Sequence, residues 1–107
     1  MANYVSVETR LVQTIQYVTP TTGATITVNP SGFVKLLIDP AGTLATLTVN
    51  LPASPSDGDN VSLSSSQIVT GFTMGGGTIV GALTTLVVAT FAAYMFNAAS
   101  GKWWRVG

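Results

Sequence analysis

The sequence predicts an all-β protein, a small antiparallel β-sandwich or barrel of about eight short strands that works as an oligomer. Three observations lead to this prediction. Apolar and polar residues alternate along several runs, as they do on a half-buried strand. Clusters of the turn formers Gly, Pro, Asn and Asp separate these runs at intervals of roughly 8–15 residues. Threonine and valine, which are stiff at χ1 and favoured on a pleated surface, dominate the runs.

The first half of the chain shows the alternation most clearly. Residues 5–18 place mostly apolar side chains at odd positions and polar ones at even positions, which predicts a half-buried strand. Further along, Leu47 and Val49 fall on one face of a run and Thr48 on the other. The strands expected in this half, each followed by a turn or loop, are residues 5–18, 24–28, 33–39 and 43–51.

The alternation resumes after a polar loop with the sequence LPASPSDGDN (51–60). Val61 and Leu63 start the next strand, and a further alternating run from Ile68 to Met74 ends at a run of three glycines.

Residues 78–99 carry no charge and fit two readings. One is a transmembrane helix, flanked by the aromatic and basic residues 102–105. Several threonines, a glycine and an asparagine dilute its hydrophobicity, however, and residues 90–96 alternate with period two. We therefore expect a pair of strands buried on both faces, and a last strand at 103–106 that pairs back onto 91–96.

The composition excludes several classes of function. The 107 residues include no Cys and no His, so thiolate metal sites, disulfides and the commonest general base are missing. The net charge is zero and only four residues are Lys or Arg, too few for the basic face that binds nucleic acid. We expect no nucleic-acid partner and no membrane partner.

The acidic loop at Asp57, Asp59 and Asn60 could be read as a calcium site or as a turn. A calcium loop of the EF-hand type also needs a Glu at its twelfth position, and the only Glu in the chain is Glu8. Asp followed by Gly58 supplies the backbone conformations of a turn. The sequence therefore predicts a turn and no metal site.

No catalytic or cofactor-binding residue is expected. Residues 64–66 are three serines, but the chain has no His to activate one of them. Glu8, Asp39 and the two loop carboxylates could in principle form a glycosidase pair, which would need a sugar cleft between its members. The glycines at 75–77 lack the Lys-Ser/Thr that follows in a phosphate-binding loop.

The C-terminal part resembles a recurring β-module of tailed bacteriophage virion proteins. The resemblance lies in LPASPSDGDNVSL with its P-x-D-G loop, in GGGTIVGA, in the aromatic YMF and in the ending WWRVG. It covers about residues 44–107, and residues 1–43 match no family pattern. Such modules occur in tail fibres, tailspikes and head decoration proteins. The resemblance implies a non-enzymatic protein, often trimeric, in the virion assembled in the bacterial cytoplasm.

The chain is expected to form one domain, 1–107, with N-terminal strands in 1–43 and the phage-like module in 44–107. So apolar a chain has too little interior to hide its hydrophobic residues, which predicts a homo-oligomer. The preference for a trimer comes from the resemblance to the phage modules alone. Because adjacent strand residues face opposite ways, only one of the two tryptophans can point outward. The expected interface residues are Leu86, Val88, Phe91, Tyr94, Phe96, Trp103 and Trp104.

The function expected is that of a capsid decoration (cement) or head-fibre protein, bound to the major capsid or a tail protein. One alternative is a fibre-tip module that binds carbohydrate or a host surface. A third is a small membrane-anchored protein whose helix would be residues 78–99.

Overall fold

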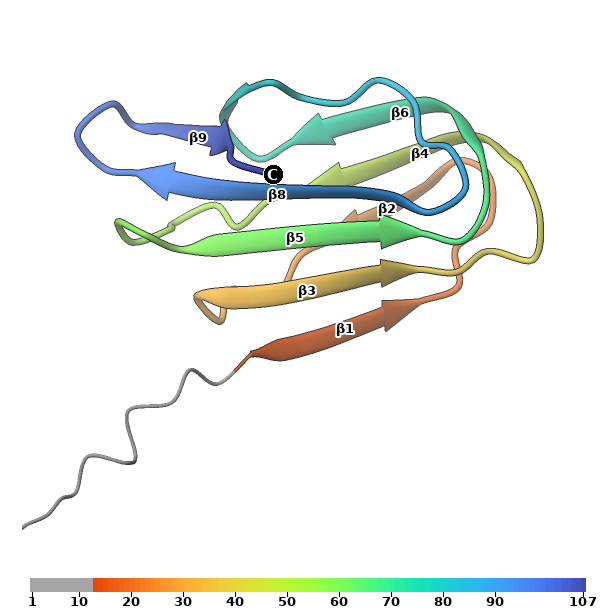
Figure 1. Cartoon of the computed structure of the whole chain (residues 1–107), viewed down its shortest axis with the longest axis horizontal. Coiled ribbons are helices and arrows are strands. Elements are labelled where there is room, and N and C mark those ends of the chain that lie inside the picture. Colours follow the sequence, from red (N-terminus) through yellow and green to blue (C-terminus); the bar gives the residue numbers. More distant parts are fainter. Residues whose placement is uncertain (1–12) are drawn as a thin grey trace, which may run out of the picture.

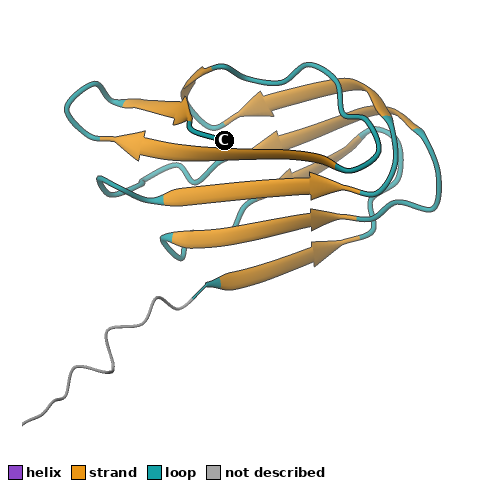
Figure 2. Cartoon of the chain, viewed as in Figure 1, coloured by secondary structure: helices purple, strands orange, loops and turns teal. Residues whose placement is uncertain are grey.

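The computed structural model describes residues 13–107, in which nine strands and no helix are found (Figure 2). The all-β prediction is confirmed, although part of the first expected strand, residues 5–12, lies outside the described residues. The strands are β1 Thr14–Val18, β2 Ala24–Thr27, β3 Phe33–Ile38, β4 Leu44–Asn50, β5 Asn60–Ser65, β6 Val69–Gly75, β7 Thr78–Val80, β8 Thr90–Asn97 and β9 Lys102–Arg105.

The first six strands form three successive coils of a solenoid-like arrangement. Strands β1, β3 and β5 lie side by side and run parallel, and β2, β4 and β6 do the same in a second sheet behind them (Figure 1). Each coil therefore gives one strand to each sheet, and the two sheets enclose the core.

The prediction of an antiparallel sandwich or barrel is wrong in strand direction. Among residues 13–107, five of the seven strand pairs are parallel and two are antiparallel. Alternation of apolar and polar residues is the same in both kinds of strand, so it does not report direction. Short turns such as residues 19–23 suggest hairpins, but here they carry the chain from one sheet to the other.

The C-terminal strands close the six-stranded sheet, whose order is β1-β3-β5-β8-β9-β7. β8 pairs antiparallel with β5, and β9 folds back antiparallel onto β8, as expected for the last strand. The uncharged run 78–99 contains the short strand β7, a connection at 81–89 and β8, which corrects the expected pair of strands buried on both faces. Within residues 13–107 no helix has the length and apolarity to cross a membrane.

The core is built from the inward positions of each coil. In β3 and β5 every second residue faces inward and is buried, as the period-two pattern predicts, and in β8 the inward Ala92 and Tyr94 are buried. The residues exposed by 1% or less that face this interior include Val34, Leu36, Ile38, Leu47, Val49, Val61, Leu63, Val69, Ala92, Tyr94 and Trp103.

The first coil differs from the next ones at its inward position. Gln16 occupies the row that Leu36 and Leu63 fill in the following coils. Its side-chain amide donates to the carbonyl of Thr27 (3.0 Å) and accepts from the backbone N–H of Asn29 (2.9 Å). The glutamine thus links β1 to the end of β2 and the residues after it, and both atoms of its amide are hydrogen-bonded. A polar residue suits this position, because the first coil of a solenoid has no further coil to cover its outer side.

The expected division at residue 43 falls inside one coil. β3 lies before it and β4 after it, and both pair with strands of the preceding and following coils. Both parts of the chain therefore share the same two sheets.

Candidate functional site

The acidic loop forms a turn whose carboxylates are used by backbone groups. Gly58 has φ +86°, a conformation that glycine adopts without steric cost. Asp59 accepts a hydrogen bond from the N–H of Ser56 (2.8 Å), and Asp57 accepts one from Ala98 (2.8 Å) in the turn between β8 and β9. The Asp59 bond closes the loop on itself, and the Asp57 bond fastens the loop to the C-terminal turn. No group of three His, Cys, Asp or Glu side chains that could hold a metal occurs in the described residues 13–107.

Three of the seven expected interface residues lie in the interior of the chain itself. Leu86 and Tyr94 are fully buried, and Trp103 is 1% exposed. The Tyr94 hydroxyl donates to the carbonyl of Gly81 (2.9 Å), which satisfies its polar end. Phe96 is half-buried, with its ring centroid 5.5 Å from that of Trp103. These side chains stabilise the fold of the single chain and expose little or no surface.

The other three expected residues are exposed on the surface. Val88 lies in the connection before β8, and Phe91 and Trp104 project from the outer face of the six-stranded sheet. The Nζ of Lys35, on the same face, lies 5.5 Å from the centre of the Phe91 ring. The prediction that the two tryptophans would face opposite ways is confirmed.

Val80, Met95 and Trp104 form a continuous apolar row, here called the hairpin patch. In the register of the sheet, Val80 is opposite Trp104, and Trp104 is opposite Met95. Each of the three is between 37% and 39% exposed. Lys102 extends from the same face two residues before Trp104, whose indole N–H donates to Ser100 (3.0 Å). The patch thus combines a positioned aromatic ring with a neighbouring cation.

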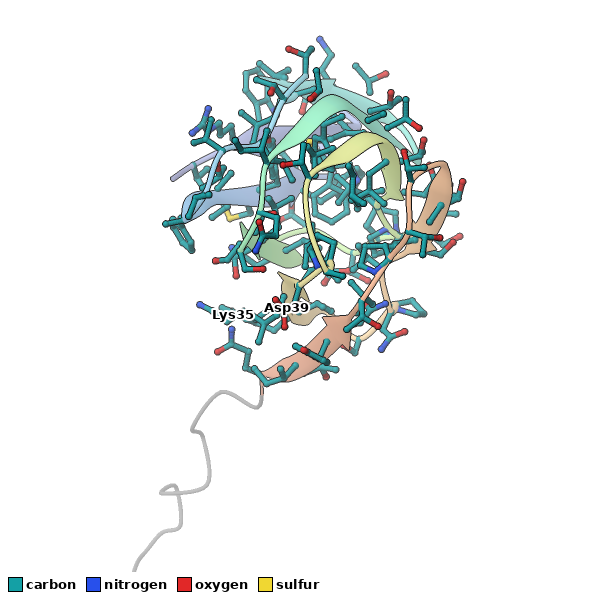
Figure 3. All side chains as sticks on the ribbon, turned by 90° about the vertical axis from the view of Figure 1, so that its right-hand side faces the viewer. Lys35 and Asp39 are labelled. Carbon is teal, nitrogen blue, oxygen red and sulfur yellow. The ribbon has the colours of Figure 1, made fainter. Side chains whose placement is uncertain are left out.

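A second feature lies on the same face near the ends of β1, β3 and β5. Asp39 follows β3 directly, and its carboxylate accepts hydrogen bonds from the hydroxyls of Tyr17 and Ser66, the latter at 2.6 Å. Figure 3 looks onto this end of the sheets, where Lys35 and Asp39 are seen close together in the view along the strands and the Lys35 side chain extends away from the core. A shallow cleft of about 300 Å³ opens beside these groups. It is lined by Tyr17, Leu37, Ile38, Asp39, Ser64, Ser65 and Ser66 and is called the Asp39 cleft below.

The three serines of residues 64–66 have separate roles in this region. Ser65 faces inward, is 2% exposed and donates its hydroxyl to the carbonyl of Gln67 (2.7 Å). Ser66 binds Asp39, and Ser64 lines the cleft. With no His in the chain, none of the hydroxyls has an imidazole base beside it.

The hydrogen bonds around Asp39 shift two pKa values in opposite directions. The bond from Ser66, followed by that from Tyr17, lowers the pKa of Asp39, because both stabilise the carboxylate. The bond to Asp39 is also the largest cause that raises the pKa of Tyr17, together with partial burial and the carboxylate charge. At neutral pH Asp39 is therefore an anion and Tyr17 a neutral donor.

The lowered pKa of Asp39 predicts a stability difference that depends on pH. A carboxylate with a folded pKa below the unfolded value of about 3.9 stabilises the fold above that value, and this contribution is lost as the pH falls through the folded pKa. We expect the urea midpoint of the wild type to exceed that of Asp39→Asn at pH 7 and the gap to close below about pH 4. A gap that stays constant from pH 7 to pH 2 would contradict this.

The sequence did not point to the Asp39 cleft, because its parts are far apart in the chain. Tyr17, Asp39 and Ser66 lie in three different coils, and parallel registration brings them to one end of the sheet. The sequence does hold one sign of the cleft. Each of the three residues lies at or just after the end of a strand, at a position whose side chain faces outward.

No protein-family model matches the chain, and a search of curated proteins finds no match either.

Proposed function

We propose that the protein is a non-enzymatic structural component of a tailed-phage virion, a capsid decoration or head-fibre protein that assembles as a homotrimer. The observation that carries the assembly is the hairpin patch. A row of three partly exposed apolar side chains, one of them tryptophan, is the kind of surface that forms the centre of an interface. The attribution to a virion draws on the resemblance of residues 44–107.

Two features of the chain support an interface at this patch. Neighbouring exposed side chains, Phe91 and Val106, enlarge the apolar area on the same part of the sheet, where the backbone of Val106 bonds to β8. Because the net charge is zero, electrostatic repulsion between copies of the chain is weak. Burying this surface between copies gives the proposed trimer its stability, and the remaining surface is left for the capsid or tail protein.

We expect Trp104→Ala to dissociate the oligomer while leaving the subunit folded. The loss of a central aromatic contact should cost about 2–4 kcal/mol, which weakens association by roughly 30-fold or more. Light scattering measures the mass against the 11.0 kDa of one chain, and circular dichroism reports the strands. Ile68→Ser, at another exposed apolar position outside the patch, is the control and should keep the native mass.

A wild-type protein that has the mass of one chain at every concentration would refute the assembly. An oligomer that Trp104→Ala leaves intact would place its interface on another surface.

A further inference from the structure

We propose that the first coil is a self-association surface, at which β1 of one copy pairs edge to edge with β1 of a second copy. The two strands run antiparallel about a two-fold axis, and Ile15 of each copy lies opposite Tyr17 of the other. This contact does not rest on the trimer proposed above, because the hairpin patch lies at the opposite edge of the six-stranded sheet.

The two ends of the solenoid differ in how their strand edges are covered. At the last coil, Val69 of β6 exchanges two backbone hydrogen bonds of 2.9 Å with Leu86, and Phe72 donates another to Thr84. At the first coil, no strand of residues 13–107 lies beside the outer edge of β1 or β2 (Figure 1). Neither strand contains a proline or a charged residue, which commonly protect an open edge. The first coil is therefore the end at which a further strand can pair.

The backbone of β1 directs two of its residues to this open side. The carbonyl of Val18 accepts a hydrogen bond from the N–H of Asp39 (2.8 Å), so it points toward β3. The N–H and C=O groups of successive strand residues point alternately to the two sides of the strand. The backbone groups of Ile15 and Tyr17 consequently point away from β3, to the open edge.

These groups fix the register of the contact. In an antiparallel ladder, a hydrogen-bonded pair of residues exchanges both of its N–H···O bonds. Placing Ile15 opposite Tyr17 of the second copy uses both backbone groups of each residue, and the two-fold axis repeats the pair. The contact then contains four backbone hydrogen bonds, and Gln16 of one copy faces Gln16 of the other at the axis.

The exposed side chains of β1 match this register. In β3 and β5 the apolar residues of the alternating pattern face the core, whereas in β1 Gln16 faces inward and the apolar residues face outward. Ile15 is 56% exposed and Tyr17 is 59% exposed. A β-branched residue directly opposite an aromatic one stabilises a strand pair. The contact would thus cover apolar side chains that the single chain leaves in solvent.

A second copy fits this edge better than the residues that precede β1. A tight hairpin that folded those residues back onto β1 would need Gly, Asn or Asp in its turn, where the sequence has Val12 and Gln13. A two-fold axis perpendicular to the sheets would also bring the β2 edges of the two copies toward each other, because β2 is the outermost strand of the second sheet at the same end. Such an interface is isologous and closes with two copies.

Single cysteines test the register, because the chain has none of its own. Gln16→Cys should form a disulfide between two copies on mild oxidation, since residues that face each other at the axis have Cα atoms about 4.5 Å apart. Thr14→Cys is the matched control, because two copies of residue 14 would be at least about 13 Å apart. The double variant Thr14→Cys/Val18→Cys should link again, since these positions lie opposite each other. Non-reducing gel electrophoresis measures the linked fraction.

A proline tests the backbone bonds. Ile15→Pro removes an N–H that points to the open edge and leaves the bonds to β3 in place, so it should weaken association at least about tenfold. Ile15→Thr keeps the N–H and the β-branch and should weaken association less. Sedimentation at several concentrations measures association, and circular dichroism reports the fold. Trp104→Ala, in the hairpin patch, should leave the disulfide of Gln16→Cys unchanged.

Three results would overturn this pairing. The first is a Gln16→Cys variant that does not link, and the second is a Thr14→Cys variant that links equally well. The third is an Ile15→Pro variant that folds and associates as tightly as the wild type. Any of these in a protein that Trp104→Ala still dissociates would leave the trimer standing, whereas a linked Gln16→Cys dimer that Trp104→Ala does not change supports the edge contact alone.

Discussion

Trp103→Ala is expected to lower the free energy of unfolding by about 3–5 kcal/mol, the cost of removing a large aromatic side chain from a packed interior. Trp103 is the largest fully buried side chain, contacts the ring of Phe96 and lies opposite Ile79 of β7. Its removal would leave a cavity where β7, β8 and β9 meet. Since a domain of this size is stabilised by about 5–15 kcal/mol, much of the total would be lost.

Urea denaturation followed by circular dichroism measures this effect. Trp103→Phe keeps an aromatic ring in place and should retain most of the stability if the alanine variant does not fold. Trp104→Ala, measured at high dilution, changes the neighbouring side chain on the opposite face and should cost less than about 1 kcal/mol. Equal effects of the two alanine substitutions would contradict the assignment of Trp103 to the core and Trp104 to the surface.

Gly76→Ala is expected to be the most damaging small substitution in the protein. A Cβ at this position would lie within about 3 Å of three backbone atoms of Leu51, a distance that side-chain movement cannot relieve. The backbone also has φ +92°, which favours glycine. Because Leu51 hydrogen-bonds to the neighbouring Gly75 (2.9 Å), the clash would force β4 and β6 apart where they pair.

The matched control is Gly58→Ala. Gly58 has a similar φ of +86°, but no atom lies within 4 Å of its added Cβ. It should therefore show only the backbone cost, about 1–2 kcal/mol, whereas Gly76→Ala should lose at least about 3 kcal/mol or fail to fold. Thermal unfolding of both variants measures the difference. Similar losses would show that conformation, and not the contact with Leu51, decides the need for glycine at position 76.

The strand content could be predicted from the sequence because alternation depends on local geometry. The pairing of the last strand with 91–96 was also predictable, since a short Ser-Gly turn joins two runs that alternate. Strand direction was not, because parallel partners such as Val34 and Val61 are joined through an entire coil. An internal repeat does mark the coils, since Thr25, Thr48 and Thr73 form one row of the three-stranded sheet and each lies in a similar alternating run.

The candidate site could be predicted only in part. The sequence indicated that Trp103 and Trp104 would face opposite ways but did not tell which would face the solvent. That choice depends on which face of the six-stranded sheet packs against the three-stranded sheet, and Trp103 lies on that face beside Ile79 of β7. The Asp39 cleft needs three coils in register, which a pattern within one strand does not specify. Leu86 and Tyr94 were expected at an interface because they are apolar, but both are buried in the core of the single chain.

The coiled arrangement makes the height of the molecule adjustable in discrete steps. Residues 33–59 make one full circuit, since Phe33 and Asn60 lie side by side in neighbouring strands. A duplicated circuit would meet only its two neighbours and could be inserted without rebuilding the first coil or the C-terminal hairpin. Each insertion would move the hairpin about 4.8 Å farther from β1. The length of such a molecule would therefore be counted in turns of the chain while its two ends stay the same.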